Sequence, residues 1–108
     1  MDNQEKKERR KYKRYPFKEE ILIDGIAKAY SLNICEAGIF LCTLYQLEKG
    51  SVINITIASK FTVKAEVKNY QPGIGMGIEF IDLNHDQEIM IKKLIEDIKL
   101  NNLKNSKL

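Results

Sequence analysis

Two arginines near the amino terminus have the spacing and the chemistry to bind phosphate or guanine. Arg10 and Arg14 are four positions apart, so they project to the same side in a helix (about 6 Å of rise) or in an extended segment (about 13 Å). The planar guanidinium group pairs with phosphate oxygens and with O6 and N7 of guanine. The two side chains can therefore converge on one ligand, although a solvated basic tail has the same composition.

A second segment with binding chemistry is Asn33-Ile34-Cys35-Glu36-Ala37-Gly38. The side chain of Asn33 both donates and accepts hydrogen bonds, and Gly38 permits a backbone turn and a close approach to a ligand. Taken alone, the segment is an ordinary connection between two strands. The segment becomes informative only together with the two arginines, through the order and spacing of the two segments along the chain.

The charge of the chain is concentrated at its amino terminus. Residues 1 to 18 carry eight Lys or Arg against three Asp or Glu, a net charge of +5, whereas the other ninety residues carry ten basic against twelve acidic groups, a net charge of −2. A basic arm on a mildly acidic body favours polyanions: nucleic acid, anionic lipid or a phosphorylated small molecule. The net charge alone does not distinguish among these three kinds of partner.

Most of the chain has the period-two alternation of β-strands. Asp24-Gly25 supplies a hairpin turn between the first two apolar runs, and the clearest alternation begins at Phe61. The helical period starts after residue 83, where Asn84 and Gln87 have capping-box spacing. The expected strands are 20–23, 26–32, 39–43, 52–57, 61–68 and 74–80, and the helical stripe is Ile91, Leu94, Ile95 and Ile98. Six short strands and one helix predict an antiparallel barrel or sandwich, with the helix over an open end or an exposed edge.

The last expected strand alternates large and small residues. Ile74, Met76, Ile78 and Phe80 share one face, and Gly75 and Gly77 share the other with Glu79. The glycines leave room on the outer face for a backbone or a ligand, or they serve to bend a barrel strand. The pattern supports both explanations equally.

Length and composition exclude several classes of protein. The chain has 108 residues, 44% hydrophobic and 31% charged, which describes one domain. Its apolar stretches are far shorter than the roughly 20 residues of a membrane-spanning helix, and no secretory signal is recognisable, so we expect a cytoplasmic protein without membrane insertion. Cys35, Cys42 and the single histidine lack the spacing of a metal or redox site, so we expect reduced structural thiols and no metal. No arrangement of nucleophile, base or phosphate loop indicates an enzyme.

The order of the two binding segments resembles the paired signature of PilZ domains, bacterial receptors for cyclic di-GMP. Arg-x-x-x-Arg precedes the first strand, and Asn-x-Cys-x-x-Gly, close to the family's Asp/Asn-x-Ser-x-x-Gly, follows the second. The resemblance extends from about Glu8 to Leu100 and includes residues 75–80 as a last barrel strand. It implies a six-stranded antiparallel β-barrel with a C-terminal α-helix: a basic arm at 1–15, the barrel and helix at 16–100, and a frayed tail at 101–108.

The resemblance also assigns roles to individual residues. Arg10 and Arg14 would hold phosphate and guanine, Asn33 and the next motif position, Cys35, would contact guanine, and Gly38 would shape the turn. An arginine directly before the motif, here Arg9, often accompanies an intercalated dimer of the ligand, so we expect two ligands per site. Additional residues expected to face the ligand are Met76 and Gly77.

The predicted function is that of a receptor and adaptor. Cyclic di-GMP would order the arginine arm on the barrel, and the new surface would signal to an effector protein that the sequence does not identify. Cys35 departs from the family's serine, and one lost neutral hydrogen bond would weaken binding by about 0.5 to 1.5 kcal/mol. The alternative is a degenerate PilZ domain that binds no cyclic di-GMP and acts through protein contacts. Nucleic acid is a poorer fit, because no aromatic pair on a polar strand face offers a stacking platform.

Overall fold

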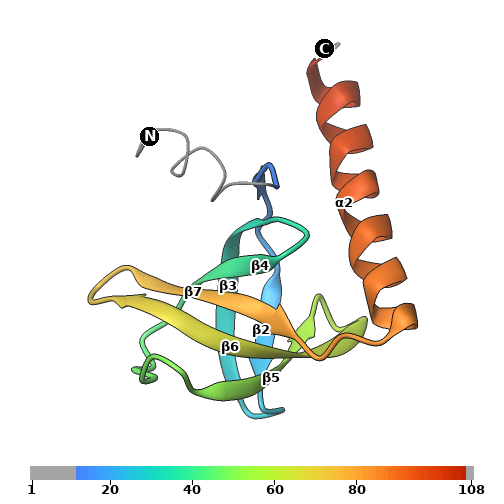
Figure 1. The fold of residues 1–108 in the computed structure, drawn as a ribbon. Coiled ribbons are helices and arrows are strands. Elements are labelled where there is room, and N and C mark those ends of the chain that lie inside the picture. Colours follow the sequence, from blue (N-terminus) through green and yellow to red (C-terminus); the bar gives the residue numbers. More distant parts are fainter. Residues whose placement is uncertain (1–11, 107–108) are drawn as a thin grey trace, which may run out of the picture.

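The computed structural model describes residues 12–106 and contains strands from β1 to β7 and one long helix, α2 (Figure 1). Each strand is short, and the connections between them are tight turns or polar loops. The elements are β1 (Tyr15–Pro16), β2 (Glu20–Ile23), β3 (Ala27–Ile34), β4 (Gly38–Cys42), β5 (Val52–Ile57), β6 (Phe61–Gln71), β7 (Gly75–Ile81) and α2 (His85–Ser106).

Six of the strands close into an antiparallel barrel, which confirms the predicted fold class. The order of hydrogen-bonded neighbours is β3, β2, β5, β6, β7 and β4, and β4 pairs again with β3 to complete the ring. Closure leaves no open sheet edge among these strands. The two-residue strand β1 is an addition to the prediction and pairs with the end of β3, on the same side as β2.

The barrel interior is filled by the inward side chains of the alternating strands. The clearest alternation, in β5 and β6, places three apolar residues of each strand in the core while the residues between them lie outside. This is the period-two arrangement that the sequence predicts. The inward residues of these two strands are Ile53, Ile55, Ile57, Val63, Ala65 and Val67.

The turn between β2 and β3 has the backbone conformation that Asp-Gly predicts. Asp24 and Gly25 have φ angles of 52° and 74°, and the amide of Ile26 donates to the carbonyl of Ile23 at 3.0 Å. Two positive φ angles are characteristic of the hairpin turn whose twist matches that of the flanking strands. The turn between β5 and β6 has the same feature at Ala58 and Ser59, with φ angles of 53° and 57°.

The helix begins with the predicted capping box. The amide of Gln87 donates to Oδ1 of Asn84 at 2.8 Å, and the amide of Asn84 donates to Oε1 of Gln87 at 2.9 Å. Nε2 of Gln87 also donates to the carbonyl of Thr62 at 2.9 Å, which attaches the start of the helix to β6. Ile91 and Ile95 then pack in the same buried cluster as the strand residues. The helix extends to Ser106, so it continues beyond residue 100, where the predicted tail begins.

Three sequence expectations about single positions require correction. Asn33 belongs to β3 and not to the connection after it. Ile74 lies in the turn before β7 and is exposed, because Pro72-Gly73 reverses the chain before the alternation resumes at Gly75. Cys42 is exposed on the outer face of β4, whereas Cys35 is buried; both are free thiols.

Candidate functional site

A β-bulge in β3 turns Asn33 outward. Ser31 pairs with Leu41 of β4 and Asn33 pairs with the next residue, Phe40, so Leu32 is an extra residue in β3. The bulge shifts the alternation by one, and Ser31 and Ile34 are both buried. Without the bulge, the side chain of Asn33 would point into the apolar core. Bulges commonly re-aim side chains at functional sites in this way.

Arg14 lies beside the outward face of Asn33. Because Pro16 pairs with Asn33 in the β1–β3 ladder, the preceding residues pass along the outside of the barrel. Nη1 of Arg14 donates to Oδ1 of Asn33 at 2.8 Å. The contact joins the second arginine of one motif to the first residue of the other, nineteen positions away.

The buried hydroxyl of Ser31 fastens the segment that leads from the arginine motif into β2. Its Oγ accepts from the amide of Glu19 at 2.9 Å and donates to the carbonyl of Phe17. The amide of Ser31 also donates to the carbonyl of Glu19 at 3.0 Å. In the segment between β1 and β2 these contacts to β3 take the place of a regular ladder, and they fix the place where the arm joins the barrel.

The connection from β3 to β4 forms a tight turn against β7. The amide of Cys35 donates to the carbonyl of Gly38 at 2.9 Å. A Cβ atom at position 38 would overlap the carbonyl oxygen of Ile78, so glycine is needed for β4 to approach β7. The role that the motif gives to Gly38 in shaping the turn is thus accompanied by a packing requirement between strands.

A cavity of about 200 Å³ opens where these segments meet. Arg14 and Tyr12 border it on the side of the arm, Cys35 and Gly38 come from the β3–β4 turn, and Gly77 comes from β7. The cavity is smaller than the roughly 300 to 1,000 Å³ of a typical small-molecule pocket. It can therefore enclose only part of a dinucleotide, the rest of which would lie on the open surface.

The opposite wall of the cavity is built by a second bulge, in β6. Val67 pairs with Ile78 and Asn69 pairs with Gly77, so Lys68 is the extra residue. Consequently Lys68 and Asn69 both face outward, and both border the cavity.

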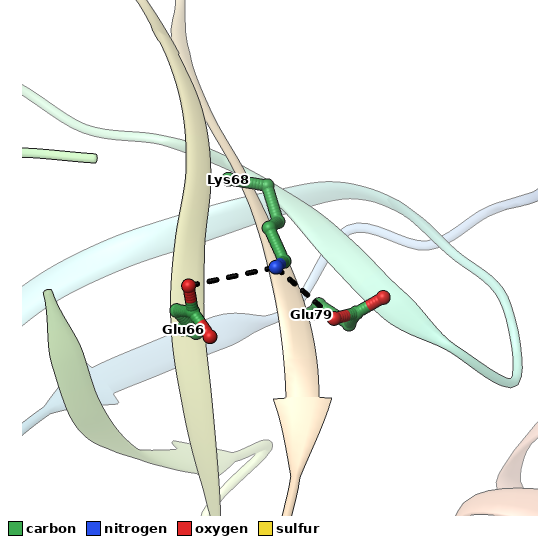
Figure 2. Close-up of polar contacts among 3 residues, drawn as sticks. All are labelled: Glu66, Lys68 and Glu79. Atoms are coloured by element: carbon green, nitrogen blue, oxygen red, sulfur yellow. Dashed lines mark hydrogen bonds and ion pairs between the residues drawn. The ribbon is translucent and has the colours of Figure 1, made fainter. Parts of the chain in front are cut away.

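Lys68 forms ion pairs with two glutamates on the outside of the barrel (Figure 2). Its Nζ lies 3.5 Å from Oε2 of Glu66 and 3.5 Å from Oε1 of Glu79, and these two glutamates face each other across β6 and β7. The carboxylate of Glu66, and then that of Glu79, raises the pKa of Lys68 above its usual 10.5. Lys68 is therefore fully charged at neutral pH and offsets the repulsion between two directly opposed carboxylates.

The structure brings most of the predicted site residues together. Arg14, Cys35, Gly38 and Gly77 border the cavity, and Asn33 adjoins it through Arg14. Arg9 and Arg10 lie outside the described residues. Met76, which we expected to face a ligand, is completely buried in the core, because it lies on the inward face of β7.

The two glycines of β7 make room for different neighbours. A Cβ atom at Gly75 would overlap the carbonyl oxygen of Leu41, so the close neighbour is the backbone of β4. At Gly77 a Cβ atom would come within 3.2 Å of the side chain of Asn69. The space beside β7 is thus taken by the backbone of the paired strand β4 at Gly75 and by the side chain of Asn69 at Gly77, which also borders the cavity.

Sequence reasoning missed Tyr12, Lys68, Asn69 and Glu79 as residues of the cavity wall. Tyr12 lies inside the Arg-x-x-x-Arg motif, which was a usable signal. The consecutive polar residues Lys68 and Asn69 interrupt the alternation of their strand, and such an interruption is the sequence mark of a bulge. The partners of Lys68 on β6 and β7 depend on register, which the alternation alone does not give.

The described part of the chain contains neither a cluster of metal-binding side chains nor a helix that could span a membrane. Over residues 12–106, no three His, Cys, Asp or Glu side chains gather as they would around a metal ion. In the same range, no helix has the length and apolar character needed to cross a membrane.

Comparison with known proteins identifies the family. A model of the PilZ domain matches residues 8–97, which include both motifs and all strands of the barrel. The chain belongs to the PilZ domain family. PilZ domains are binding domains, and the cavity described above lies between the two motifs of this one.

A solved structure with the same fold is that of YcgR from Escherichia coli in complex with c-di-GMP. The two proteins superpose with a TM-score of 0.71 at 12% sequence identity. The match covers 92% of this chain and 50% of the YcgR chain, so the PilZ domain described here spans about half the length of that protein. At this identity the likeness establishes the fold. No curated protein sequence matches the chain.

Proposed function

We propose that this PilZ domain binds cyclic di-GMP at the cavity between its two motifs. The observation that carries the proposal is the hydrogen bond from Arg14 to Asn33, which joins the motifs at the edge of the cavity. The remaining donors of the Arg14 guanidinium group are suited to phosphate or to the O6 and N7 edge of guanine. Arg10, four residues earlier, supplies a second guanidinium group for the same ligand.

The proposed mechanism is ordering of the arginine arm by the ligand. The ligand would draw Arg9, Arg10 and Arg14 onto the barrel around Asn33, where Arg14 already donates to Oδ1 of Asn33; Arg9 and Arg10 lie outside the described residues. The phosphates of cyclic di-GMP would neutralise part of the +5 charge of the first 18 residues and draw the arginines together. The arm and the ligand would then form a new surface beside the barrel.

A second ligand molecule fits this proposal. The cavity encloses only part of one dinucleotide, and the exposed remainder would offer a base face for stacking. Arg9 would contribute the additional charge that an intercalated dimer requires. We therefore expect two molecules of cyclic di-GMP per domain.

The output of the receptor would pass to another protein, in the cytoplasm. We infer an adaptor and not an enzyme, because PilZ domains act by binding and the cavity wall has the chemistry of a binding site. The effector is expected to recognise the ordered arm together with the adjacent barrel surface.

The second candidate, favoured by one observation, is a degenerate PilZ domain that no longer binds cyclic di-GMP. Cys35 occupies the motif position of serine, and its thiol is a weak donor and acceptor that is buried beside the cavity. Such a domain would act through protein contacts alone.

Titration calorimetry at physiological salt distinguishes the two candidates. Wild type should bind cyclic di-GMP with micromolar or tighter affinity and a ratio of two ligands per domain, and Arg10→Ala/Arg14→Ala should abolish the heat. The control is Lys49→Ala/Lys64→Ala, which changes the net charge equally at two exposed sites away from the cavity and should bind as wild type does. If wild type gives no heat and no competition in a second assay, the receptor proposal is wrong.

A further inference from the structure

The cavity wall opposite the arginine motif carries a carboxylate. Among the described residues that line the cavity, Glu79 is the one with a carboxyl side chain, and it comes from β7, whereas Arg14 comes from the arm. An arginine and a carboxylate on one cavity can recognise complementary groups of the same base. This combination is informative because guanine and adenine differ on both of their hydrogen-bonding edges.

The Watson–Crick edge of guanine presents two adjacent donors, N1–H and the 2-amino group. A carboxylate accepts both, since each oxygen has two acceptor positions. Adenine presents an acceptor at N1 and a donor at its 6-amino group, so a carboxylate opposite adenine would face a lone pair. Arginine reads O6 and N7 on the other side of guanine, which leaves the Watson–Crick edge available to a second residue.

The amides of Asn33 and Asn69 and the hydroxyl of Tyr12 each combine one acceptor atom with a donor, so none matches two adjacent donors as a carboxylate does. Oδ1 of Asn33 already accepts from Arg14. The Cys35 thiol is a weak hydrogen-bonding group and is buried. Glu79 is half exposed, and its carboxylate is therefore both the stronger acceptor and the more accessible one.

Lys68 forms an ion pair with Glu79 and offsets part of its charge. Oε1 of Glu79 lies 3.5 Å from Nζ of Lys68, and the other oxygen points away from the lysine (Figure 2). A bare carboxylate beside a ligand with two phosphates would repel it. The ion pair with Lys68 lowers that repulsion and leaves acceptor positions on Glu79 unused.

We propose that Glu79 selects guanine over adenine in this PilZ domain by accepting from N1–H and the 2-amino group, with Lys68 as its positioning residue. The inference rests on the proposed function and adds the determinant of base specificity to it. It also assigns a purpose to the bulge in β6, since the extra residue is Lys68 itself.

The decisive variant is Glu79→Gln, because a glutamine amide offers one acceptor and one donor, the complement of the Watson–Crick edge of adenine. The measurement is the affinity for cyclic di-GMP and for cyclic di-AMP, each by calorimetry on the full chain. The ratio of the two affinities should fall by about tenfold or more, in keeping with the discrimination given by a good bidentate pair.

Glu66→Gln is the matched control. It removes the same kind of ion pair from Lys68, at the same distance, but Glu66 does not line the cavity. Its affinity ratio should stay within about twofold of wild type. Lys68→Met should lower the affinity ratio although Glu79 is intact. Lys68→Arg should keep the wild-type ratio, as expected of a positioning residue.

Each result supports or overturns the inference. If Glu79→Gln and Glu66→Gln change cyclic di-GMP affinity alike and leave the ratio unchanged, the carboxylates are only counterions of Lys68 and the inference is wrong. If wild type binds cyclic di-GMP but Glu79→Gln has the same ratio of affinities for cyclic di-GMP and cyclic di-AMP as wild type, the inference is wrong and the proposed function stands. Wild type that binds no cyclic di-GMP overturns both.

Discussion

At Cys35 this chain departs from the PilZ motif, and the location of the thiol makes the effect of that departure testable. The thiol is buried beside the cavity, where the family has a hydroxyl that forms stronger hydrogen bonds. We expect Cys35→Ser to bind cyclic di-GMP two- to tenfold more tightly, because one neutral hydrogen bond contributes about 0.5 to 1.5 kcal/mol. Calorimetric titration of the variant against wild type measures the change.

Cys42→Ser provides the control for that experiment. Cys42 is exposed on β4 and does not line the cavity, so its replacement should leave the affinity unchanged. Cys35→Ser should at the same time unfold at slightly lower urea concentration, since a hydroxyl is harder to bury than a thiol. Equal affinities of Cys35→Ser and wild type would show that the ligand does not contact position 35.

At the scale of elements, the hairpin turns show how one backbone conformation is made with different residues. Ser59 has a φ angle of 57°, a conformation that costs L-residues roughly 1 kcal/mol. We expect Ser59→Gly to raise the free energy of unfolding by about 0.5 to 1 kcal/mol, because glycine adopts this conformation without strain. Urea denaturation monitored by circular dichroism tests the change.

The reverse substitution at the β2–β3 turn is the natural counterpart. Gly25 has a φ angle of 74° and open space where a Cβ would lie, so Gly25→Ala introduces strain without a steric clash. It should lower the free energy of unfolding by about 1 kcal/mol. Two variants that shifted stability in the same direction would contradict this account of the turns.

The elements differ in how far they could be predicted from the sequence. The alternation of β5 and β6 and the capping box of α2 depend on neighbouring residues, so they were predictable in detail. The bulges at Leu32 and Lys68 depend on which residue of one strand faces which residue of another. For that reason the sequence alone predicts a loop at Asn33 and does not indicate the ion pairs of Lys68. The short strand β1 likewise depends on tertiary contacts with β3.

At the scale of the whole molecule, the binding site is assembled from segments that are distant in sequence. The arm, the β3–β4 turn and residues within β6 and β7 all border one cavity. The arm contributes positive charge to this cavity, and the barrel contributes Glu79 together with its compensating lysine. The arm thus supplies the positive charge of the site, whereas the wall on β6 and β7 pairs Glu79 with Lys68.

The helix and the barrel share one hydrophobic core and should therefore unfold together. Ile95 is 3% exposed and packs in the same cluster as the strand residues, whereas Ile89, on the same helix, is 48% exposed. We expect Ile95→Ala to lower the free energy of unfolding by about 2 to 5 kcal/mol and Ile89→Ala to change it by about 0.5 kcal/mol or less.

The measurement is urea denaturation of both variants, followed by far-ultraviolet circular dichroism for the helix and by tyrosine fluorescence for the tertiary structure. The two probes should give the same midpoint in wild type and in both variants, because the loss of α2 would expose to water the core residues against which Ile95 packs. If the helix signal of Ile95→Ala disappeared at a lower urea concentration than the tyrosine signal, the helix would be a separate unit docked on an independently stable barrel.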